Sequence, residues 1–310
     1  GTLLTVLMQA SGAVVAIIIT AAQGGLMSIE AACAMVIGTN IGTTSTAAVL
    51  SDHGWHPIAD AADLSALFDS PTWRERAGAA ASSTPPIPAI EATILTPLPS
   101  PRKILCCGLN YRDHIVETGR EIPTHPTIFA KFADTLTGPT DTIVVTKSQR
   151  VDWEAELVVV VGHDVADADR ETAAAAILGY TVANDVSMRD WQSRTLQWLQ
   201  GKAFDATTPI GPVVVTADEL DPTAGLRVVG RVNGEVVQDG NTSELVFDAA
   251  ALVASVSQFT RLRAGDLVLT GTPGGVGMGM TPPRFLADGD VLETEIEGIG
   301  TLTNTVRLRA

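Results

Sequence analysis

The sequence is poor in cysteine and in positive charge, and each shortage argues against a class of protein. Of its three cysteines, Cys106 and Cys107 are adjacent and Cys33 lies far from both. Adjacent cysteines rarely form a low-strain disulfide, so we expect a reduced, cytoplasmic protein. The 20 Lys and Arg residues against 35 Asp and Glu give a formal net charge of −15. This charge argues against a nucleic-acid partner, because phosphate binding depends on basic side chains.

The sequence also lacks an apolar run long enough to span a membrane. The first 51 residues contain one charged residue, Glu30, and Gly12 to Ala22 form an apolar run of eleven residues. A spanning helix needs roughly 20 apolar residues. No Lys or Arg precedes the run, which is atypical of a signal peptide. We therefore predict an apolar helical segment over residues 1–50, packed as a buried helix pair or, as an alternative, touching a membrane.

Two motifs in this segment resemble one repeat of a sodium/phosphate cotransporter. They are Leu-Met-Gln-Ala-Ser-Gly-Ala at 7–13 and Ile-Gly-Thr-Asn-Ile-Gly-Thr-Thr at 37–44, the first departing from the family pattern at Ala10 and Gly12. Transporters of this kind form their site between paired repeats. The chain carries one repeat-like segment, so we do not expect transport. A membrane-attached fusion protein is the alternative for residues 1–48.

The rest of the chain is predicted to divide near residue 101. Residues 51–101 are polar and end in a Pro-rich linker, which indicates a truncated N-terminal domain. Residues 102–310 form the expected catalytic, metal-binding domain. Strands are predicted at 104–108, 143–146, 157–161, 228–237 (a hairpin turning at Asn233-Gly234), 267–270, 291–296 and 302–308. Helices are predicted within 55–68 and at 169–177, 188–199 and 248–259. The fold class is therefore α+β, mainly β, with attached helices.

Three carboxylates are candidate metal ligands. Glu154 and Glu156 lead into the apolar strand at 157–161, and alternation along a strand places both on one face. Two carboxylates at so short a distance repel each other unless a cation offsets their charge. Asp185 ends another apolar stretch and is a candidate third ligand. Oxygen ligands favour Mg²⁺, with Mn²⁺ or Ca²⁺ as alternatives. Spacing alone favours other roles over metal binding: a solvated strand end for Glu154 and Glu156, and a helix N-cap for Asp185.

Two further features suggest acid–base chemistry and anion binding. His114 and Glu117 are three residues apart and share a face if their segment is helical, which suits a general base fixed by a carboxylate. A surface ion pair is the alternative. Lys202 lies in a predicted loop, where a lone lysine is usually solvated. The segment Thr-Gly-Thr-Pro-Gly-Gly-Val-Gly at 270–277 presents backbone N–H groups and the Thr272 hydroxyl to an anion, or forms a tight structural turn.

Taken together, five motifs in order make residues 102–310 resemble the fumarylacetoacetate hydrolase family. They are Gly-Leu-Asn-Tyr-x-x-His at 108–114, Glu-x-Glu at 154–156, Asn-Asp at 184–185, Gly-Lys-x-Phe-Asp at 201–205 and Thr-Gly-Thr-Pro at 270–273. The resemblance implies a β-rich roll around a divalent metal, usually in a homodimer. Family members usually begin with a small β-rich domain, whose first half the transporter-like segment replaces here.

The resemblance also assigns roles to individual residues. It implies Glu154, Glu156 and Asp185 as metal ligands, His114 and Glu117 as the dyad that activates water, and Lys202 as a third catalytic residue. It implies four substrate-binding residues: Arg112, Lys131, Gln192 and Thr272. The expected reaction is hydrolysis of a C–C bond in a small anionic 2,4-dioxo acid, of the acylpyruvate or fumarylacetoacetate type. Decarboxylation or isomerisation of a related 2-oxo or 2-hydroxy dioic acid is the alternative.

Overall fold

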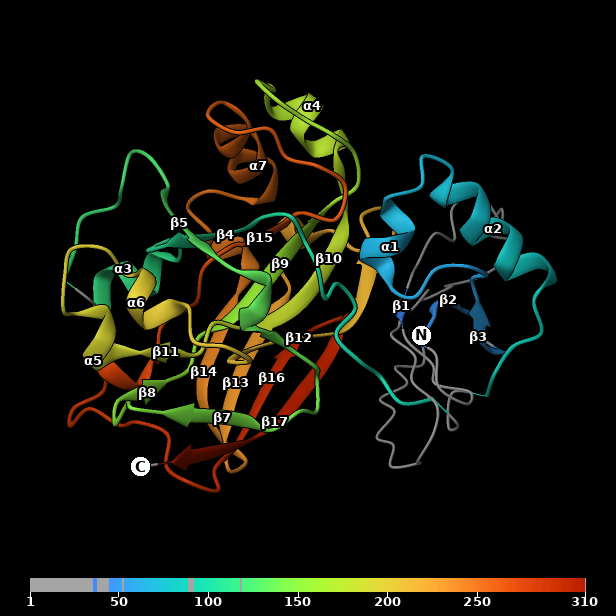
Figure 1. The fold of residues 1–310 in the computed structure, drawn as a ribbon. Helices are drawn as coiled ribbons and strands as arrows, with labels where there is room; N and C mark the ends of the chain where they lie inside the picture. The colour runs from blue at the N-terminus through green and yellow to red at the C-terminus, as the bar shows by residue number, and fades with distance from the viewer. Residues whose placement is uncertain (1–35, 38–44, 52, 89–91, 118, 310) are drawn as a thin grey trace.

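The computed structural model describes residues 36–37, 45–51, 53–88, 92–117 and 119–309 (Figure 1). The predicted apolar helical segment falls on residues outside these ranges. The described part of residues 1–50 contributes strands β1 (Val36–Ile37) and β2 (Ala47–Ser51), which form a three-stranded antiparallel sheet with β3 (Gly54–Pro57). Among the described residues, no helix has both the length and the apolarity needed to cross a bilayer.

Two helices accompany this small sheet on one side of the molecule (Figure 1). Helix α1 (Leu64–Phe68) is capped by Asp63, whose side chain accepts a hydrogen bond from the Ala66 N–H, and helix α2 (Trp73–Ser83) packs against β2 and β3. The helix predicted within 55–68 is therefore limited to α1, at the end of that range. The start of the range belongs to strand β3, which pairs with β2.

The body of the molecule is a mixed sheet of seven strands in the order β5-β4-β15-β9-β10-β12-β6. Their bounds, in that order, are Thr127–Lys131, Ile104–Gly108, Leu267–Leu269, Ala155–Val161, Ile177–Asn184, Thr208–Thr216 and Leu136–Thr137. Every residue of β9 and β10 is buried, as expected for central strands covered on both faces.

A second sheet of five strands packs against β9, β10 and β12, in the order β14-β13-β16-β17-β7. The bounds are Glu235–Asn241, Arg227–Val232, Val291–Ile296, Gly300–Arg309 and Ile143–Thr146. The turn between β13 and β14 is Asn233-Gly234, with positive φ at both residues, as a two-residue hairpin of type I′ requires. The short strands β8 (Val151–Asp152) and β11 (Ser187–Met188) pair beside the two sheets.

The remaining helices are short and lie at the edges of the sheets (Figure 1). Helices α4 (Arg170–Ala175) and α7 (Ala249–Ser257), which pack together, confirm two sequence predictions. The other three are α3 (Arg112–Glu117), α5 (Arg189–Gln192) and α6 (Leu199–Lys202). Single 3₁₀ turns occur at η2 (Ala133–Thr135), η3 (Pro222–Ala224), η4 (Thr242–Glu244) and η5 (Gly277–Gly279). The mainly β class with attached helices is thus confirmed.

The single helix predicted over 188–199 is wrong, because the chain forms α5 and α6 with a loop between them. In that loop the Thr195 hydroxyl accepts a hydrogen bond from the Gln197 N–H at 3.2 Å. Local bonds of this kind compete with helical hydrogen bonding. The interruption turns α6 back toward β11, and so places Lys202 over the ends of the central strands.

Candidate active site

A cavity of about 1060 Å³ lies where α3, α5 and α6 meet β4, β5 and the segment 272–283. It brings together seven of the predicted site residues: His114, Glu117, Glu154, Glu156, Gln192, Lys202 and Thr272. Asp185 and Lys131 are buried at its base, with 0% and 4% of their surface exposed. Residues from α3, α5, α6, β5 and β9, and from the loops between strands, therefore converge on one space.

The three predicted metal ligands are neighbours because β9 and β10 are antiparallel. Glu156 pairs with Ala183 in the register of these strands, so Asp185, which directly follows β10, lies beside the start of β9 and Glu154. One carboxylate oxygen from each of the three lies within 4.8 Å of the others. Three buried, hard oxygen donors at this separation fit a divalent cation. The buried group thus replaces the solvated strand end that spacing alone favoured.

Three cationic side chains contact two of these carboxylates, Glu154 and Asp185. Lys202 Nζ lies 2.7 Å from Glu154 Oε2 and 2.8 Å from Asp185 Oδ2. Arg189 Nη1 lies 2.7 Å from Glu154 Oε1, and Lys131 Nζ contacts Asp185 Oδ1. Three positive charges thus face Glu154 and Asp185, which reduces the free energy needed to bury these two carboxylates.

The glutamates in this group have opposite electrostatic environments. Burial favours the neutral form of Glu154, but Lys202 and Arg189 outweigh burial and lower its pKa to about 2. Burial raises the pKa of Glu156 well above its usual range, and Asp185 and Glu154 add to the rise. Glu156 is thus a carboxyl group for which the surrounding side chains supply too little positive charge, a deficit that a bound cation would offset.

The predicted dyad is formed within α3. The His114 Nδ1 atom lies 3.1 Å from Glu117 Oε2, and Glu117 Oε1 also accepts a hydrogen bond from the Gly275 N–H at 3.2 Å. A carboxylate beside Nδ1 selects the tautomer with the proton on Nδ1, so Nε2 carries the lone pair. His114, Glu117 and Glu154 also line the same cavity. The dyad and the carboxylate group therefore belong to one site.

The glycine loop, residues 271–279, binds anions as its composition suggested, but these anions are the protein's own carboxylates. The loop donates five backbone hydrogen bonds: Gly271 to Glu156, Gly274 to Asp113, Gly275 to Glu117, and Gly277 and Met278 to Asp152. A run of N–H groups directed at carboxylates fixes their positions without adding charge. The loop is thus a support for the acids of the site.

Thr272 stands at the start of this loop with its hydroxyl oriented by Gln238. The Gln238 Nε2 group donates to Thr272 Oγ1 at 2.8 Å, and its Oε1 accepts from the Ala155 N–H at 3.0 Å, which fixes the amide orientation. Because Oγ1 already accepts a hydrogen bond, the Thr272 proton is available to a ligand in the cavity. Sequence reasoning had missed Gln238.

Comparison with known proteins agrees with this geometry. Residues 103–307 match the family model described as fumarylacetoacetate (FAA) hydrolase, C-terminal. The chain belongs to the fumarylacetoacetate hydrolase family. Among curated members, "Oxaloacetate tautomerase FAHD2A, mitochondrial" of Homo sapiens is 47% identical over 231 residues, 74% of each chain. Residues 1–70 match the Na+/Pi-cotransporter model, in line with the resemblance seen in the sequence.

Solved structures in the family carry more than one activity in their names. One is 5-carboxymethyl-2-hydroxymuconate delta-isomerase from Mycobacterium smegmatis, with a TM-score of 0.65 and 38% identity over 72% of this chain and 85% of that one. Another is fumarylpyruvate hydrolase from Pseudomonas aeruginosa in complex with Mn²⁺ and pyruvate, with a TM-score of 0.60 and 32% identity over 67% of this chain and 90% of that one. The family therefore includes both isomerases and hydrolases.

Three of the residues predicted from the family resemblance have surroundings that differ from those expected of them. Arg112 is exposed at the first position of α3 and does not line the cavity, so its substrate role stays a prediction. Lys131 is buried against Asp185 and does not line the cavity wall. Lys202 is the last residue of α6 and not part of a loop, and only 2% of its surface is exposed.

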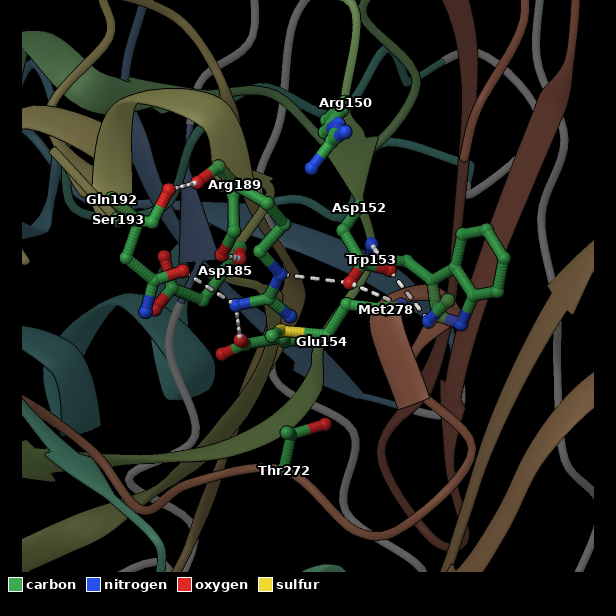
Figure 2. Close-up of polar contacts among 12 residues, drawn as sticks. Arg150, Asp152, Trp153, Glu154, Asp185, Arg189, Gln192, Ser193, Thr272 and Met278 are labelled. Atoms are coloured by element: carbon green, nitrogen blue, oxygen red, sulfur yellow. Dashed lines mark hydrogen bonds and ion pairs between the residues drawn. The ribbon is translucent and has the colours of Figure 1, made fainter. Parts of the chain in front are cut away.

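Two charged residues of the site had escaped prediction. Arg189 lines the cavity between Asp152 and Glu154 (Figure 2). Its position three residues before Gln192 places both on one face of a short helix, a signal visible in the sequence. Asp152 lies two residues before Glu154, the spacing that had identified the glutamate pair.

Proposed function

We propose that the chain is a divalent-metal-dependent enzyme that interconverts the keto and enol forms of a small 2-oxo dicarboxylic acid of the oxaloacetate type. The observation that carries this proposal is a His–Glu dyad beside three buried carboxylates in one cavity. The 47% identity to an oxaloacetate tautomerase supports tautomerisation over the C–C hydrolysis that the sequence alone had favoured.

The reaction moves one proton between carbon 3 of the substrate and its 2-oxo oxygen, and the dyad supplies the base. In the keto-to-enol direction, Nε2 of His114 accepts the carbon-bound proton while Glu117 stabilises the imidazolium. The oxygen receives a proton from water, while cationic Lys202 stabilises the charge that develops there, and His114 releases its proton to water to restore the starting state. The reverse reaction retraces these transfers. A divalent cation held by Glu154, Glu156 and Asp185 would act as a Lewis acid on the oxygens of the 2-oxo acid.

Polar donors in the cavity would orient the substrate. The Thr272 hydroxyl is directed to the cavity by Gln238. Gln192 Oε1 accepts from Arg189 Nη1 at 2.8 Å, so the amide NH₂ is the part of Gln192 that can donate to a ligand. Two neutral donors near the reacting oxygen stabilise charge that develops there.

Arg189 is suited to the second carboxylate of a dicarboxylic substrate. Its Nε and Nη1 atoms are bound within the protein, whereas Nη2 is buried and has no hydrogen-bond partner in the part of the chain that the structure describes. A buried donor without an acceptor costs about 1–3 kcal/mol. An anionic group on the ligand would supply the missing acceptor, which favours a dicarboxylate over a monocarboxylate.

The decisive experiment follows the loss of enol absorbance from freshly dissolved oxaloacetate, with Mg²⁺ or Mn²⁺ and with or without a chelator. We expect the protein to accelerate the loss only when metal is present, without forming pyruvate or CO₂. CO₂ release at the same rate would instead indicate a decarboxylase and contradict the proposal.

Hydrolysis of an acylpyruvate is the second candidate function. It is favoured by the similarity to fumarylpyruvate hydrolase and by a dyad equally able to deprotonate water. Incubation with a short acylpyruvate distinguishes the two reactions. Metal-dependent formation of pyruvate in equal amount to the substrate lost would establish the hydrolase, whereas the tautomerase leaves the C–C bond intact.

A further inference from the structure

Asp152 is a buried carboxylate that belongs neither to the dyad nor to the three metal-ligand candidates. It ends β8, with 0% of its surface exposed. Oδ1 accepts from the N–H groups of Trp153 at 2.9 Å and Gly277 at 2.7 Å. Oδ2 accepts from the Met278 N–H at 3.0 Å and from Arg189 Nε at 2.7 Å. Because it is buried and both oxygens already accept two hydrogen bonds each, the carboxylate itself is not placed to bind a ligand.

Of these partners, Arg189 also donates hydrogen bonds through its side chain to other residues that line the cavity. Arg189 donates through Nη1 to Glu154 and Gln192, and Figure 2 shows its guanidinium between Asp152 and Glu154. Burial by itself would lower the pKa of Arg189, but Asp152 and Glu154 raise it. A planar guanidinium bound along two edges has one orientation, so the direction of Nη2 depends on Asp152.

Asp152 also joins this arginine to the glycine loop. The N–H groups of Gly277 and Met278 in η5 bind Asp152, while the N–H of Gly275, in the same loop, binds Glu117 of the dyad. A Cβ added at Gly277 would lie 2.7 Å from Asp152 Oδ1, so the loop is in close contact with this carboxylate. The same short segment thereby fixes the base at one end and the arginine at the other.

We infer that Asp152, itself held by the glycine loop, is a positioning residue for the substrate's second carboxylate and acts through Arg189. The inference rests on the proposed function, because it assumes that Arg189 binds a carboxylate of the substrate. It assigns substrate affinity to Asp152, which touches no substrate, and leaves proton transfer to the dyad.

The test is the steady-state kinetics of Asp152→Asn with enol oxaloacetate. Asparagine keeps one oxygen for the N–H groups of Trp153 and Gly277, but it removes the charge and presents an NH₂ group to Arg189 Nε and the Met278 N–H. We expect KM to rise about tenfold to a hundredfold, as for loss of a charge-assisted hydrogen bond, with a much smaller change in kcat. Asp152→Glu should recover part of the loss. Mn²⁺ affinity, measured by calorimetry, should stay at the wild-type level, and its loss would overturn the inference.

A double-mutant cycle tests whether the effect passes through Arg189. In an Arg189→Gln background, Asp152→Asn should add no further increase in KM. Additive increases would overturn the inference, because they would show that Asp152 acts independently of the arginine.

A matched control is available in Asp266, away from the cavity. Asp266 is buried, accepts from the N–H groups of Lys103 and Arg263, and lies 3.6 Å from Lys103 Nζ. Asp266→Asn therefore removes the same kind of charge with the same kind of partners. It should leave KM unchanged. An equal rise in KM for this variant would show that Asp152 acts through stability alone.

A spectroscopic measurement tests the contact between Asp152 and Arg189 independently of enzyme activity. The Nε–H signal of Arg189 in a ¹H–¹⁵N spectrum, identified by its loss in Arg189→Lys, should be protected from exchange in the wild type and lose that protection in Asp152→Asn. An unchanged signal overturns the inference even if the enzyme is a tautomerase. If the wild type shows no metal-dependent tautomerisation, the proposed function fails, and this signal still decides whether Asp152 positions Arg189.

Discussion

At the scale of single residues, the site is determined by which charges are buried together. Burial by itself would lower the pKa of Lys202, but Asp185 and Glu154 raise it above its usual value, so the lysine stays cationic. Removing one member of such a group leaves an uncompensated buried charge and costs about 3–5 kcal/mol. Variants of these residues therefore change stability as well as activity, and the dyad offers a cleaner test of catalysis.

The dyad is predicted to control proton transfer and not metal binding. His114→Ala should abolish turnover, and Glu117→Gln should lower kcat by about 10²–10⁴-fold, because the imidazole loses its supporting charge. Both variants should bind Mn²⁺ as the wild type does, which calorimetry checks. Normal turnover by His114→Ala would rule out the dyad as the base.

Glu219 is predicted to make the stability depend on pH. Burial, with help from Asp218, raises its pKa from 4.5 to about 7, and both buried oxygens lack a hydrogen-bond partner among the described residues. The folded state therefore binds this proton more tightly than the unfolded state. Its contribution to stability is complete below pH 4.5 and is lost as pH rises from about 4.5 to about 7.

Glu219→Gln should remove this loss of stability at higher pH. Melting temperatures measured from pH 4 to pH 8 should match the wild type at the acid end and exceed it at pH 8. The gain should be below about 1 kcal/mol, because the side chain is partly solvated. A variant with the wild-type pH profile would contradict the prediction.

At the scale of elements, the glycine loop connects parts of the site that are distant in the sequence. Its glycines are required where side chains of the site approach the backbone. A Cβ at Gly279 would lie 2.8 Å from Glu117 Oε1. This contact is closer than real Cβ atoms allow, so either the loop or the carboxylate must move.

Gly279→Ala should therefore displace Glu117 from His114. We expect kcat to fall about tenfold or more, within the range for a weakened general base, with little change in Mn²⁺ affinity. Gly78→Ala is the matched control, since a Cβ there meets nothing within 4 Å and the residue lies inside helix α2. That variant should be as active as the wild type and more stable by roughly 0.5–1 kcal/mol.

At the scale of the whole molecule, metal binding should raise the stability of the folded state. A cation that binds the folded state alone stabilises it by mass action, by about 2.7 kcal/mol at a hundredfold excess over Kd. Mn²⁺ should raise the melting temperature of the wild type, and chelator should reverse the rise. Glu156→Gln, which removes one of the three proposed ligands, should reduce it. Equal rises in both proteins would exclude Glu156 as a ligand.

The organisation of the full chain remains a proposal. We propose a catalytic unit from about residue 102, where the family match begins, preceded by a truncated N-terminal domain at 51–101. We also propose a homodimer, which light scattering would detect as twice the chain mass of 32.3 kDa. We propose a cytoplasmic location as well, whereas the human relative is named as mitochondrial.

The sequence by itself determined the family, the mainly β class and most residues of the site. These depend on local patterns: alternation in strands, the Asn233-Gly234 turn, and motifs in which His114 and Glu117 or Glu154 and Glu156 are close along the chain. It did not place the break between α5 and α6, because an apolar–polar pattern does not show where a side chain competes for backbone hydrogen bonds.

Only the tertiary structure decided whether these charged residues are solvated or buried, and with which partners. Lys202 and Glu154 lie 48 positions apart, and Met278 and Asp152 lie 126 apart. Contacts at that separation depend on how β8, α6 and the glycine loop pack, which no local pattern encodes. Once packed, burial removes water from the charges, so each carboxylate must find a cation or an N–H group within the protein. For that physical reason, the contact between Asp152 and Arg189 became visible only in the folded chain.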